Sequence, residues 1–185
     1  MVRHAAATVR SDRPTADWHL SPEGRAAVGV LATEPHWSGL CCLHTSPEAK
    51  AAGTAQRIAA CHGLPMYVEQ DLREVENRTW VDQCRYRSQV QSYLEGDAVD
   101  AWEPKEAALG RMRGCIGAIT TRHKGEEVAV VSHGLALTLY LAGLLGLDPP
   151  ASFELWTGMR FPDLAVLDVE AKRLEREFGR GGAEN

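Results

Sequence analysis

Two histidines in this chain stand at the ends of short apolar segments, where an imidazole is well placed to react. His4 follows Arg3 near the start of the chain, and His133 follows the branched apolar residues 128–131. An imidazole changes its charge near physiological pH and can act as a nucleophile. Gly134, directly behind His133, lets the backbone approach a ligand closely. This combination of residue types indicates group-transfer chemistry.

Further charged residues occur at comparable positions. Lys50 falls in the first turn of a helix that Ser46 and the proline after it are expected to open. Glu74 comes shortly after the β-prone residues 66–68. The Arg3 guanidinium and the Lys50 ammonium would neutralise anionic oxygens, whereas a carboxylic acid donates and accepts protons. Cations, imidazoles and one acid are therefore expected in one place.

This set of residues predicts transfer of a phosphoryl group, a reaction that depends mainly on positioning and charge neutralisation. We assign His4 as the nucleophile and Glu74 as the general acid and base. Binding of the phosphoryl oxygens is assigned to Arg3, Lys50, protonated His133 and the backbone at Gly134. The scheme needs no metal and no cofactor, and no carboxylate cluster suited to magnesium is evident in the sequence.

The chain alternates strand-like and helix-like patterns that could bring these residues together. Apolar β-prone residues occupy 40–43, 66–68, 128–131 and 164–169. Helical patterns open at Ser21 and Ser46 and recur at 109–119 and 135–145. Such alternation predicts an α/β fold with a mostly parallel sheet covered on both faces. Residues 172–178 are expected to return as an antiparallel edge strand.

In a sheet of this kind, ligands bind beyond the carboxyl ends of the strands. The expected helices after Ser46 and after His133 would begin at that edge. A helix N-terminus offers free N–H groups and the positive end of a dipole to an anion. We therefore predict a phosphate site at this edge of the sheet.

The composition is that of one globular domain, with 185 residues, 44% hydrophobic and 24% charged. We expect a single domain over residues 1–178 and a flexible tail over 179–185. A net charge of -5 gives no electrostatic reason to expect nucleic acid or an anionic membrane as a partner. The longest apolar stretch, residues 135–147, is too short to span a bilayer, and the first residues lack the apolar segment of a signal peptide.

The five cysteines show no Cys-x-x-Cys spacing, which favours reduced thiols in the cytoplasm over a zinc site or a disulfide framework. The other histidines show no metal-ligand spacing either, and we expect them to be structural or exposed. They are His19, His36, His44, His62 and His123.

The order of these motifs resembles the histidine phosphatase superfamily, which includes the cofactor-dependent phosphoglycerate mutases. Each match is weak alone, but five matches in family order between residue 2 and about residue 168 are specific. They are Arg3-His4-Ala5, Leu20-Ser21-Pro22-Glu23-Gly24, Ser46-Pro47-Glu48-Ala49-Lys50-Ala51-Ala52-Gly53-Thr54-Ala55, Leu72-Arg73-Glu74 with Trp80, and Ser132-His133-Gly134. The resemblance implies a three-layer α/β/α fold and a phosphohistidine intermediate on His4.

Several positions depart from the family pattern. Lys50 stands where most relatives carry Arg, which keeps the positive charge but loses the bidentate fork. Ala7 replaces a hydroxyl residue that often contacts phosphate, so Thr8 or Arg10 is expected to take over that contact. Arg78 replaces a glycine and would add a basic contact near the substrate.

The same residues allow several other functions. A phosphomonoesterase acting on a small phosphoester is favoured over a mutase, because the chain has little room for the insertion that encloses a mutase substrate. A phosphate-binding module without turnover is the non-enzymatic alternative. An esterase is excluded because residues 130–134 lack the small first residue of a nucleophile elbow and no later histidine completes a triad. A Rossmann domain is excluded because its glycine-rich turn is missing.

Substrate specificity is expected in residues 77–105. The arginines and aromatic residues there suit a second anionic group or a flat ring on the substrate. A solvated helix face explains the same mixture and is favoured.

Overall fold

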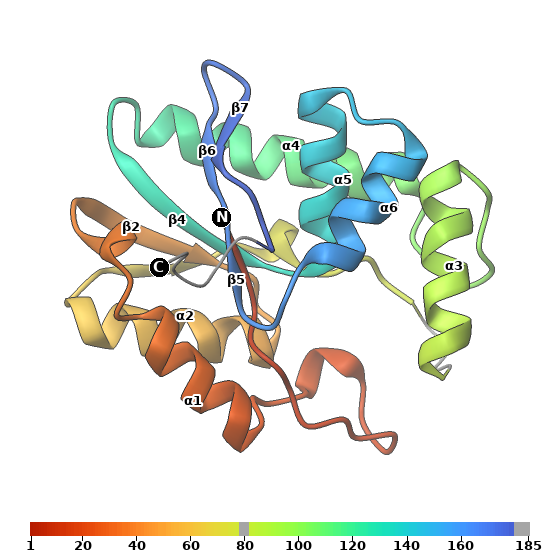
Figure 1. Cartoon of the computed structure of the whole chain (residues 1–185), viewed down its shortest axis with the longest axis horizontal. Helices are drawn as coiled ribbons and strands as arrows, with labels where there is room; N and C mark the ends of the chain where they lie inside the picture. The colour runs from red at the N-terminus through yellow and green to blue at the C-terminus, as the bar shows by residue number, and fades with distance from the viewer. Residues whose placement is uncertain (78–81, 180–185) are drawn as a thin grey trace, which may run out of the picture.

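A computed structural model describes residues 1–77 and 82–179 of the chain. Its centre is a five-stranded sheet with the strand order β3-β2-β4-β1-β5. All neighbouring pairs are parallel except β1 with β5, which is antiparallel (Figure 1). Arg78, Trp80 and residues 180–185, for which we stated expectations above, lie outside the described residues.

The strands are short, and the longest two lie next to each other inside the sheet. β2 (Leu40–Thr45) and β4 (Glu127–Ser132) have six residues each. The flanking strands are β1 (Val2–Arg3), β3 (Met66–Val68) and β5 (Asp163–Leu164). The Val128–Val131 segment of β4 is covered on both faces, which accounts for its unbroken apolar pattern.

Helices cover both faces of the sheet (Figure 1). α1 (Pro22–Leu31) and α2 (Ala49–His62) lie on one face, and α4 (Lys105–Arg122) and α5 (Gly134–Leu145) lie on the other. α3 (Gln83–Glu95) and α6 (Pro149–Gly158) pack beside α5 at one end of the molecule. The predicted three-layer α/β/α fold with a mostly parallel sheet is confirmed.

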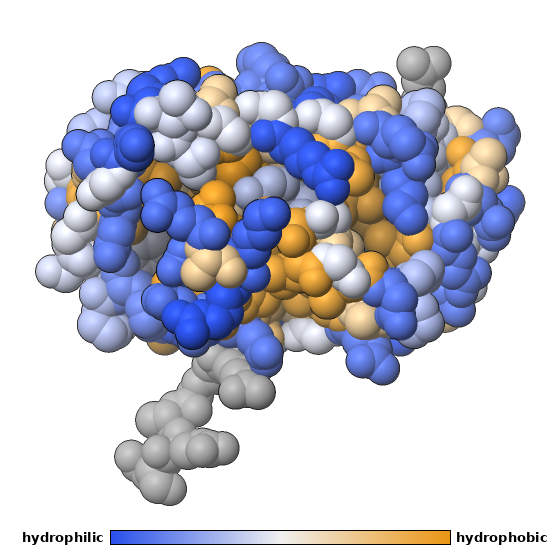
Figure 2. Space-filling view, turned by 90° about the horizontal axis from the view of Figure 1, so that it is seen from above, coloured by the Kyte–Doolittle hydropathy of each residue, from blue (hydrophilic) through white to orange (hydrophobic). Residues whose placement is uncertain are grey.

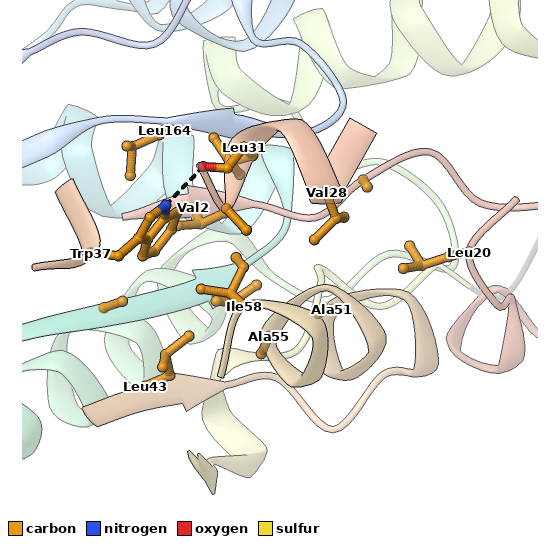
Figure 3. Packing of buried hydrophobic residues seen from close by; sticks show 14 residues of the cluster. Val2, Leu20, Val28, Leu31, Trp37, Leu43, Ala51, Ala55, Ile58 and Leu164 are labelled. Carbon is orange, nitrogen blue, oxygen red and sulfur yellow. Dashed lines mark hydrogen bonds between the residues drawn. The ribbon is translucent and has the colours of Figure 1, made fainter. Parts of the chain in front are cut away.

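The core between the sheet and the first two helices is closely packed (Figure 3). Leu43 of β2 and Ile58 of α2 are fully buried there. Trp37 closes one side of this cluster, and its indole nitrogen donates a hydrogen bond of 2.7 Å to the Leu31 carbonyl (Figure 3). Burying the large Trp37 ring therefore leaves its polar atom satisfied.

A second apolar cluster lies between the sheet and the helices α4 and α5. It includes Met112, Ile116, Leu137 and Leu141, and Phe178 packs against its edge. From above (Figure 2), apolar surface gathers in the middle of the molecule and is framed by hydrophilic surface.

Two sequence expectations about elements are wrong. Residues 172–178 do not form the sheet edge, because β7 (Arg173–Arg176) pairs with β6 (Val166–Asp168) in a separate hairpin and β5 forms the antiparallel edge. The sequence analysis did not predict α6, which the proline pair 149–150 opens after α5 has ended. Asp148 caps α6 by accepting from the Ala151 amide at 2.9 Å, and proline is well tolerated in a first helical turn.

The helix expected after Ser46 begins only at Ala49, with Glu48 as its N-cap residue. By contrast, α1 begins where the sequence indicated. The Ser21 hydroxyl accepts from the Gly24 amide at 3.0 Å, and Pro22 occupies the first helical position.

Gly24 has a steric role at the point where α1 meets the loop that carries His4. A Cβ atom at Gly24 would lie 2.0 Å from the carbonyl oxygen of Ala6. The Ser21 amide donates to that same oxygen at 3.0 Å. The absence of a side chain at Gly24 therefore lets α1 hold the segment that follows His4.

No helix among residues 1–77 and 82–179 is long and apolar enough to cross a membrane. Gly179 is the last described residue of the chain, and its amide donates a hydrogen bond of 2.8 Å to the Asp163 carboxylate.

We predict that Gly24→Ala destabilises the fold by about 2–3 kcal/mol, the order expected when a core position is overpacked against backbone. Gly29→Ala in the same helix is the matched control, because a Cβ atom at Gly29 meets nothing within 4 Å. That variant should gain about 0.5–1 kcal/mol from helix propensity. Urea unfolding of both variants measures the difference, and equal stabilities would contradict the close contact with Ala6.

Candidate active site

The carboxyl ends of three adjacent strands carry three of the candidate polar residues. His4, Ser46 and His133 each immediately follow their strand, β1, β2 and β4. The His4 amide donates to the Ser132 carbonyl at 3.0 Å, and the Ser46 amide donates to the Val131 carbonyl at 3.0 Å. These bonds extend the parallel ladder by one residue, so the sheet itself sets the spacing of the site.

His4 is buried and is oriented by its own backbone. Its Nδ1 lies 2.7 Å from the Ala5 carbonyl oxygen, which can only accept, so Nδ1 carries the proton and Nε2 keeps its lone pair. Thr54 accepts from the Ala5 amide at 3.0 Å and holds this loop against α2. Burial, with the neighbouring His133 and the Lys50 charge, holds the pKa of His4 well below its usual value. A neutral imidazole with a free Nε2 is the form that acts as a nucleophile.

His133 lies beside His4, with ring centroids 5.1 Å apart. Its Nε2 is 2.7 Å from the Ser46 hydroxyl, and its Nδ1 is buried without a hydrogen-bond partner. We expected a protonated His133, but burial and the Lys50 charge hold its pKa well below the usual value. In the structure it is therefore a neutral ring, because the cations around it disfavour a further positive charge.

Arg3 is the last residue of β1 and directly precedes His4. Its Nη1 donates to the Met159 carbonyl at 2.7 Å, and its guanidinium stacks 3.5 Å from the centre of the Phe161 ring. Burial lowers the pKa of Arg3 to about 10, so it remains a cation at neutral pH. Gly134 makes room for it, since a Cβ atom there would lie 3.0 Å from the guanidinium carbon. We expected the missing side chain of Gly134 to make room for a ligand, whereas in the structure it makes room for the Arg3 guanidinium.

Glu74 occupies the N-terminus of α5. Its Oε1 accepts from the amides of Val75 at 3.0 Å and Ala136 at 2.9 Å, and its Oε2 lies 3.3 Å from the Leu135 amide. The expectation that this helix end is free for phosphate is therefore wrong, because the carboxyl of Glu74 caps it. Burial and the charge of Glu48 raise the pKa of Glu74, the direction that suits a general acid.

Arg111 holds the backbone that carries Glu74. Its guanidinium donates to the carbonyls of Asp71, Arg73 and Glu74 at 2.8, 2.8 and 2.9 Å, and pairs with Glu103 at 2.7 and 2.8 Å. No local pattern predicts this role, because Arg111 lies 37 residues beyond Glu74 along the chain.

Lys50 is engaged by a carboxylate that the sequence analysis missed. Its Nζ lies 2.5 Å from Glu48 Oε2 and donates to the Thr15 carbonyl at 2.8 Å. The other Glu48 oxygen accepts from the Glu74 amide at 2.7 Å and lies 3.6 Å from His133. Glu48 therefore offsets part of the positive charge at the point where we predicted phosphate binding.

A cavity of about 470 Å³ opens onto these groups. Arg3, His4, Lys50, Glu74 and Gly134 all line it. Thr8 and Arg10 do not line it. Arg10 is exposed and pairs with Asp12 at 2.9 Å, and Thr8 is exposed with its amide bonded to the His19 carbonyl. Neither expected replacement contact is supported.

Aromatic and apolar side chains form the rest of the cavity wall. Trp18, Tyr86, Trp156 and Phe161 line it together with Val9. From the region expected to set specificity, Asn77, Gln83 and Tyr86 reach the cavity. Tyr93 and Trp102 instead pack against each other, with ring centroids 5.1 Å apart. The cavity wall therefore combines the cationic side chains of Arg3 and Lys50 with a largely apolar surface.

Sequence comparison matches residues 1–173 to the histidine phosphatase superfamily (branch 1). The probable phosphoglycerate mutase GpmB of Yersinia enterocolitica is 27% identical over 168 residues, covering 84% of this chain and 78% of that protein. Phosphoserine phosphatase 1 of Hydrogenobacter thermophilus is 25% identical over 186 residues, covering 94% of this chain and 87% of that protein.

Solved structures share the fold. Mycobacterial glucosyl-3-phosphoglycerate phosphatase superposes with a TM-score of 0.71 at 18% identity, covering 97% of both chains. A complex of that phosphatase with inorganic phosphate gives the same TM-score at 19% identity, covering 97% of this chain and 95% of that chain. YhfR of Bacillus stearothermophilus gives a TM-score of 0.74 at 18% identity, covering 98% and 96%.

We predict that Glu48→Gln tightens the binding of inorganic phosphate roughly 5- to 10-fold. The variant keeps the size of the side chain but removes a negative charge beside Lys50, and such a charge contributes on the order of 1 kcal/mol or more at this range. Isothermal titration calorimetry measures the change. Glu23→Gln, at an exposed position in α1, is the control with the same change in net charge. Equal or weaker phosphate binding by Glu48→Gln would count against this charge balance.

Proposed function

Because the chain belongs to the histidine phosphatase superfamily, we propose that it hydrolyses phosphomonoesters through a phosphohistidine on His4. The observation that carries this proposal is the pairing of two groups in one cavity. His4 is a buried neutral imidazole with a free Nε2, and Glu74 is a carboxyl whose pKa is raised. These are the protonation states that a nucleophile and a general acid require.

In the first step, the Nε2 lone pair of His4 attacks the phosphorus atom. The bond from phosphorus to the ester oxygen breaks, and the Glu74 proton passes to that oxygen as the alcohol leaves. Arg3 and Lys50 line the same cavity and neutralise charge on the equatorial oxygens. To do so, the Lys50 ammonium must contact the phosphoryl oxygens and the Glu48 carboxylate at the same time.

In the second step, the Glu74 carboxylate takes a proton from water, and the water oxygen attacks the phosphorus atom. The bond between phosphorus and Nε2 breaks, which returns His4 to its neutral form and releases phosphate. Both steps use only side chains of the described cavity, so the proposed reaction needs no metal and no cofactor.

We favour hydrolysis over transfer to a second hydroxyl. Phe161, on the rim of the cavity, is 46% exposed, so water can reach the phosphohistidine from this side. The apolar rim supports a small phosphoester whose alcohol carries an apolar or flat group. A cytoplasmic location is supported by the five cysteines, none of which forms a disulfide.

We predict that the protein releases phosphate from an aryl phosphate in the presence of a chelator, between pH 5 and 8. His4→Ala should lose this activity entirely, because no other imidazole replaces the attacking Nε2. His19→Ala, at an exposed histidine outside the cavity, is the control and should retain full activity. Unchanged turnover by His4→Ala would refute the mechanism.

Two further measurements separate the alternatives to hydrolysis. Interconversion of phosphoglycerates that depends on a bisphosphate primer would indicate a mutase. Phosphate binding without any release of product would indicate a binding module.

The pH dependence follows from the two shifted pKa values. The first step needs neutral His4, which persists well below pH 6.5 because its pKa is lowered, and protonated Glu74, which persists above pH 4.5 because its pKa is raised. Activity should therefore peak between the pKa of His4 and the pKa of Glu74. It should fall as the pH rises through the Glu74 pKa and as it drops through the His4 pKa.

Glu74→Gln should lower kcat for an alkyl phosphate by about 10²–10⁴-fold and should remove the decline on the alkaline side. A profile of kcat against pH for both proteins tests this. A wild-type optimum at alkaline pH would contradict the assigned protonation states.

A further inference from the structure

A group of sulfur and nitrogen atoms lies on the face of the sheet that packs against α4, away from the candidate active site. Cys42 and His44 alternate with Leu43 along β2, so their side chains point to the face opposite the one that Leu43 covers. His123 follows the last residue of α4 and meets them, although 79 residues separate it from His44.

The distances within this group are those of ligand atoms around one metal ion. Nε2 of His44 lies 3.1 Å from Nε2 of His123, and the Cys42 sulfur lies 3.6 Å from each of these nitrogens. Tetrahedral zinc has Zn–N near 2.0–2.1 Å and Zn–S near 2.3 Å, which sets its ligand atoms about 3.3–3.8 Å apart. The triangle of Cys42, His44 and His123 therefore fits one side of such a tetrahedron.

A carboxylate holds the other nitrogen of each ring. Nδ1 of His44 lies 2.9 Å from Glu69, and Nδ1 of His123 lies 3.0 Å from Glu126. An ionised carboxylate only accepts hydrogen bonds, so both Nδ1 atoms carry protons and both Nε2 atoms present lone pairs. Two lone pairs at 3.1 Å repel each other unless a cation lies between them. Carboxylates that orient imidazoles in this way are typical partners of metal-binding histidines.

A β-bulge brings a fourth donor to the group. The register of β2 against β4 shifts between Leu40 and Cys42, so that Cys41 is the extra residue. Neighbouring residues of a regular strand point to opposite faces, yet the sulfur atoms of Cys41 and Cys42 are 3.5 Å apart. The donor atoms of Cys41, Cys42 and His123 all lie within 4.8 Å of one another, and the Cys41 sulfur is 3.5 Å from Nδ1 of His123, the nitrogen that Glu126 holds.

We propose that Cys42, His44 and His123 form three corners of a tetrahedral site for a thiolate-preferring divalent ion, with Zn²⁺ as the favoured occupant, and that the neighbouring Cys41 sulfur turns into the fourth position when the ion binds. Two sulfurs and two imidazole nitrogens favour zinc over magnesium or calcium, which prefer oxygen ligands. The ion would join β2 to the loop between α4 and β4 and would stabilise the fold. None of its ligands lines the candidate active-site cavity, so the site is independent of the proposed phosphatase function.

The surroundings suit a bound ion that exchanges with solvent. Cys42 and His44 are buried, whereas Cys41 and His123 are partly exposed. His123 also borders a cavity of about 720 Å³ at the amino-terminal side of the sheet, which gives an ion a way in. The simplest competing explanation is one proton shared by the two Nε2 atoms, which would leave the sulfur atoms without a role.

The test is a titration of the reduced full-length protein with Co²⁺, a spectroscopic substitute for zinc. We expect a thiolate-to-cobalt charge-transfer band and intense visible bands of tetrahedral Co²⁺ that saturate at one equivalent and disappear when Zn²⁺ is added. Zn²⁺ should also raise the unfolding temperature by about 5–10 °C when free metal exceeds Kd about a hundredfold. A chelator should reverse this shift.

Cys42→Ser should lower the intensity of the charge-transfer band by at least about half, because only the Cys41 thiolate remains. His123→Gln, at a partly exposed position, should weaken Co²⁺ binding by at least about tenfold. Cys61→Ser is the control, because Cys61 is exposed and lies outside the group. Circular dichroism checks that the variants are folded.

Saturable tetrahedral bands that depend on Cys42 and His123 would support the site. Absence of these bands in the reduced wild-type protein would overturn it and leave the shared proton as the explanation. Bands that keep their full intensity in both ligand variants, or that are weakened equally in Cys61→Ser, would also overturn it.

Discussion

The rest of the site depends on the balance of charge in one buried pocket. Arg3 and Lys50 bring two positive charges to the carboxyl ends of β1 and β2, and the carboxyls of Glu48 and Glu74 lie against them. In a desolvated pocket these charges act strongly on each other and on the imidazoles between them. Together with burial they lower the pKa of His4, which favours the neutral form that the proposed nucleophile needs, and the charge of Glu48 raises the pKa of the Glu74 carboxyl.

The fold supports this pocket through backbone contacts more than through side-chain packing. The sheet ladder continues through His4 and Ser46, Thr54 holds the Ala5 amide, and α1 comes close enough at Gly24 to bond Ala6. Glu74 both caps α5 and faces the cavity, so the start of that helix and the position of the acid are one feature. The cluster formed by Cys41, Cys42, His44 and His123 would join the sheet to α4 from the opposite face.

The sequence predicted the layers, the parallel sheet, the gathering of His4, Lys50 and Glu74 at one cavity and the place of His133 beside His4, because motifs at strand ends come together at one edge of the sheet. It did not predict contacts that depend on where a side chain turns. Glu48 lies in a variable position of its motif but points at Lys50, and Arg10 turns away to Asp12. Arg111 and the pair of His44 and His123 act across 37 and 79 residues of chain, and no local spacing carries that information.

The measurement that tests the central claim most directly is the position of the covalent phosphate. The Glu74→Gln variant, mixed with an aryl phosphate and quenched at alkaline pH, should accumulate the phosphoenzyme, because the good leaving group needs little acid assistance while the attack of water loses its base. Mass spectrometry of its peptides should then find an acid-labile phosphate on His4. Turnover with no phosphate on His4, or with phosphate on another residue, would contradict the account.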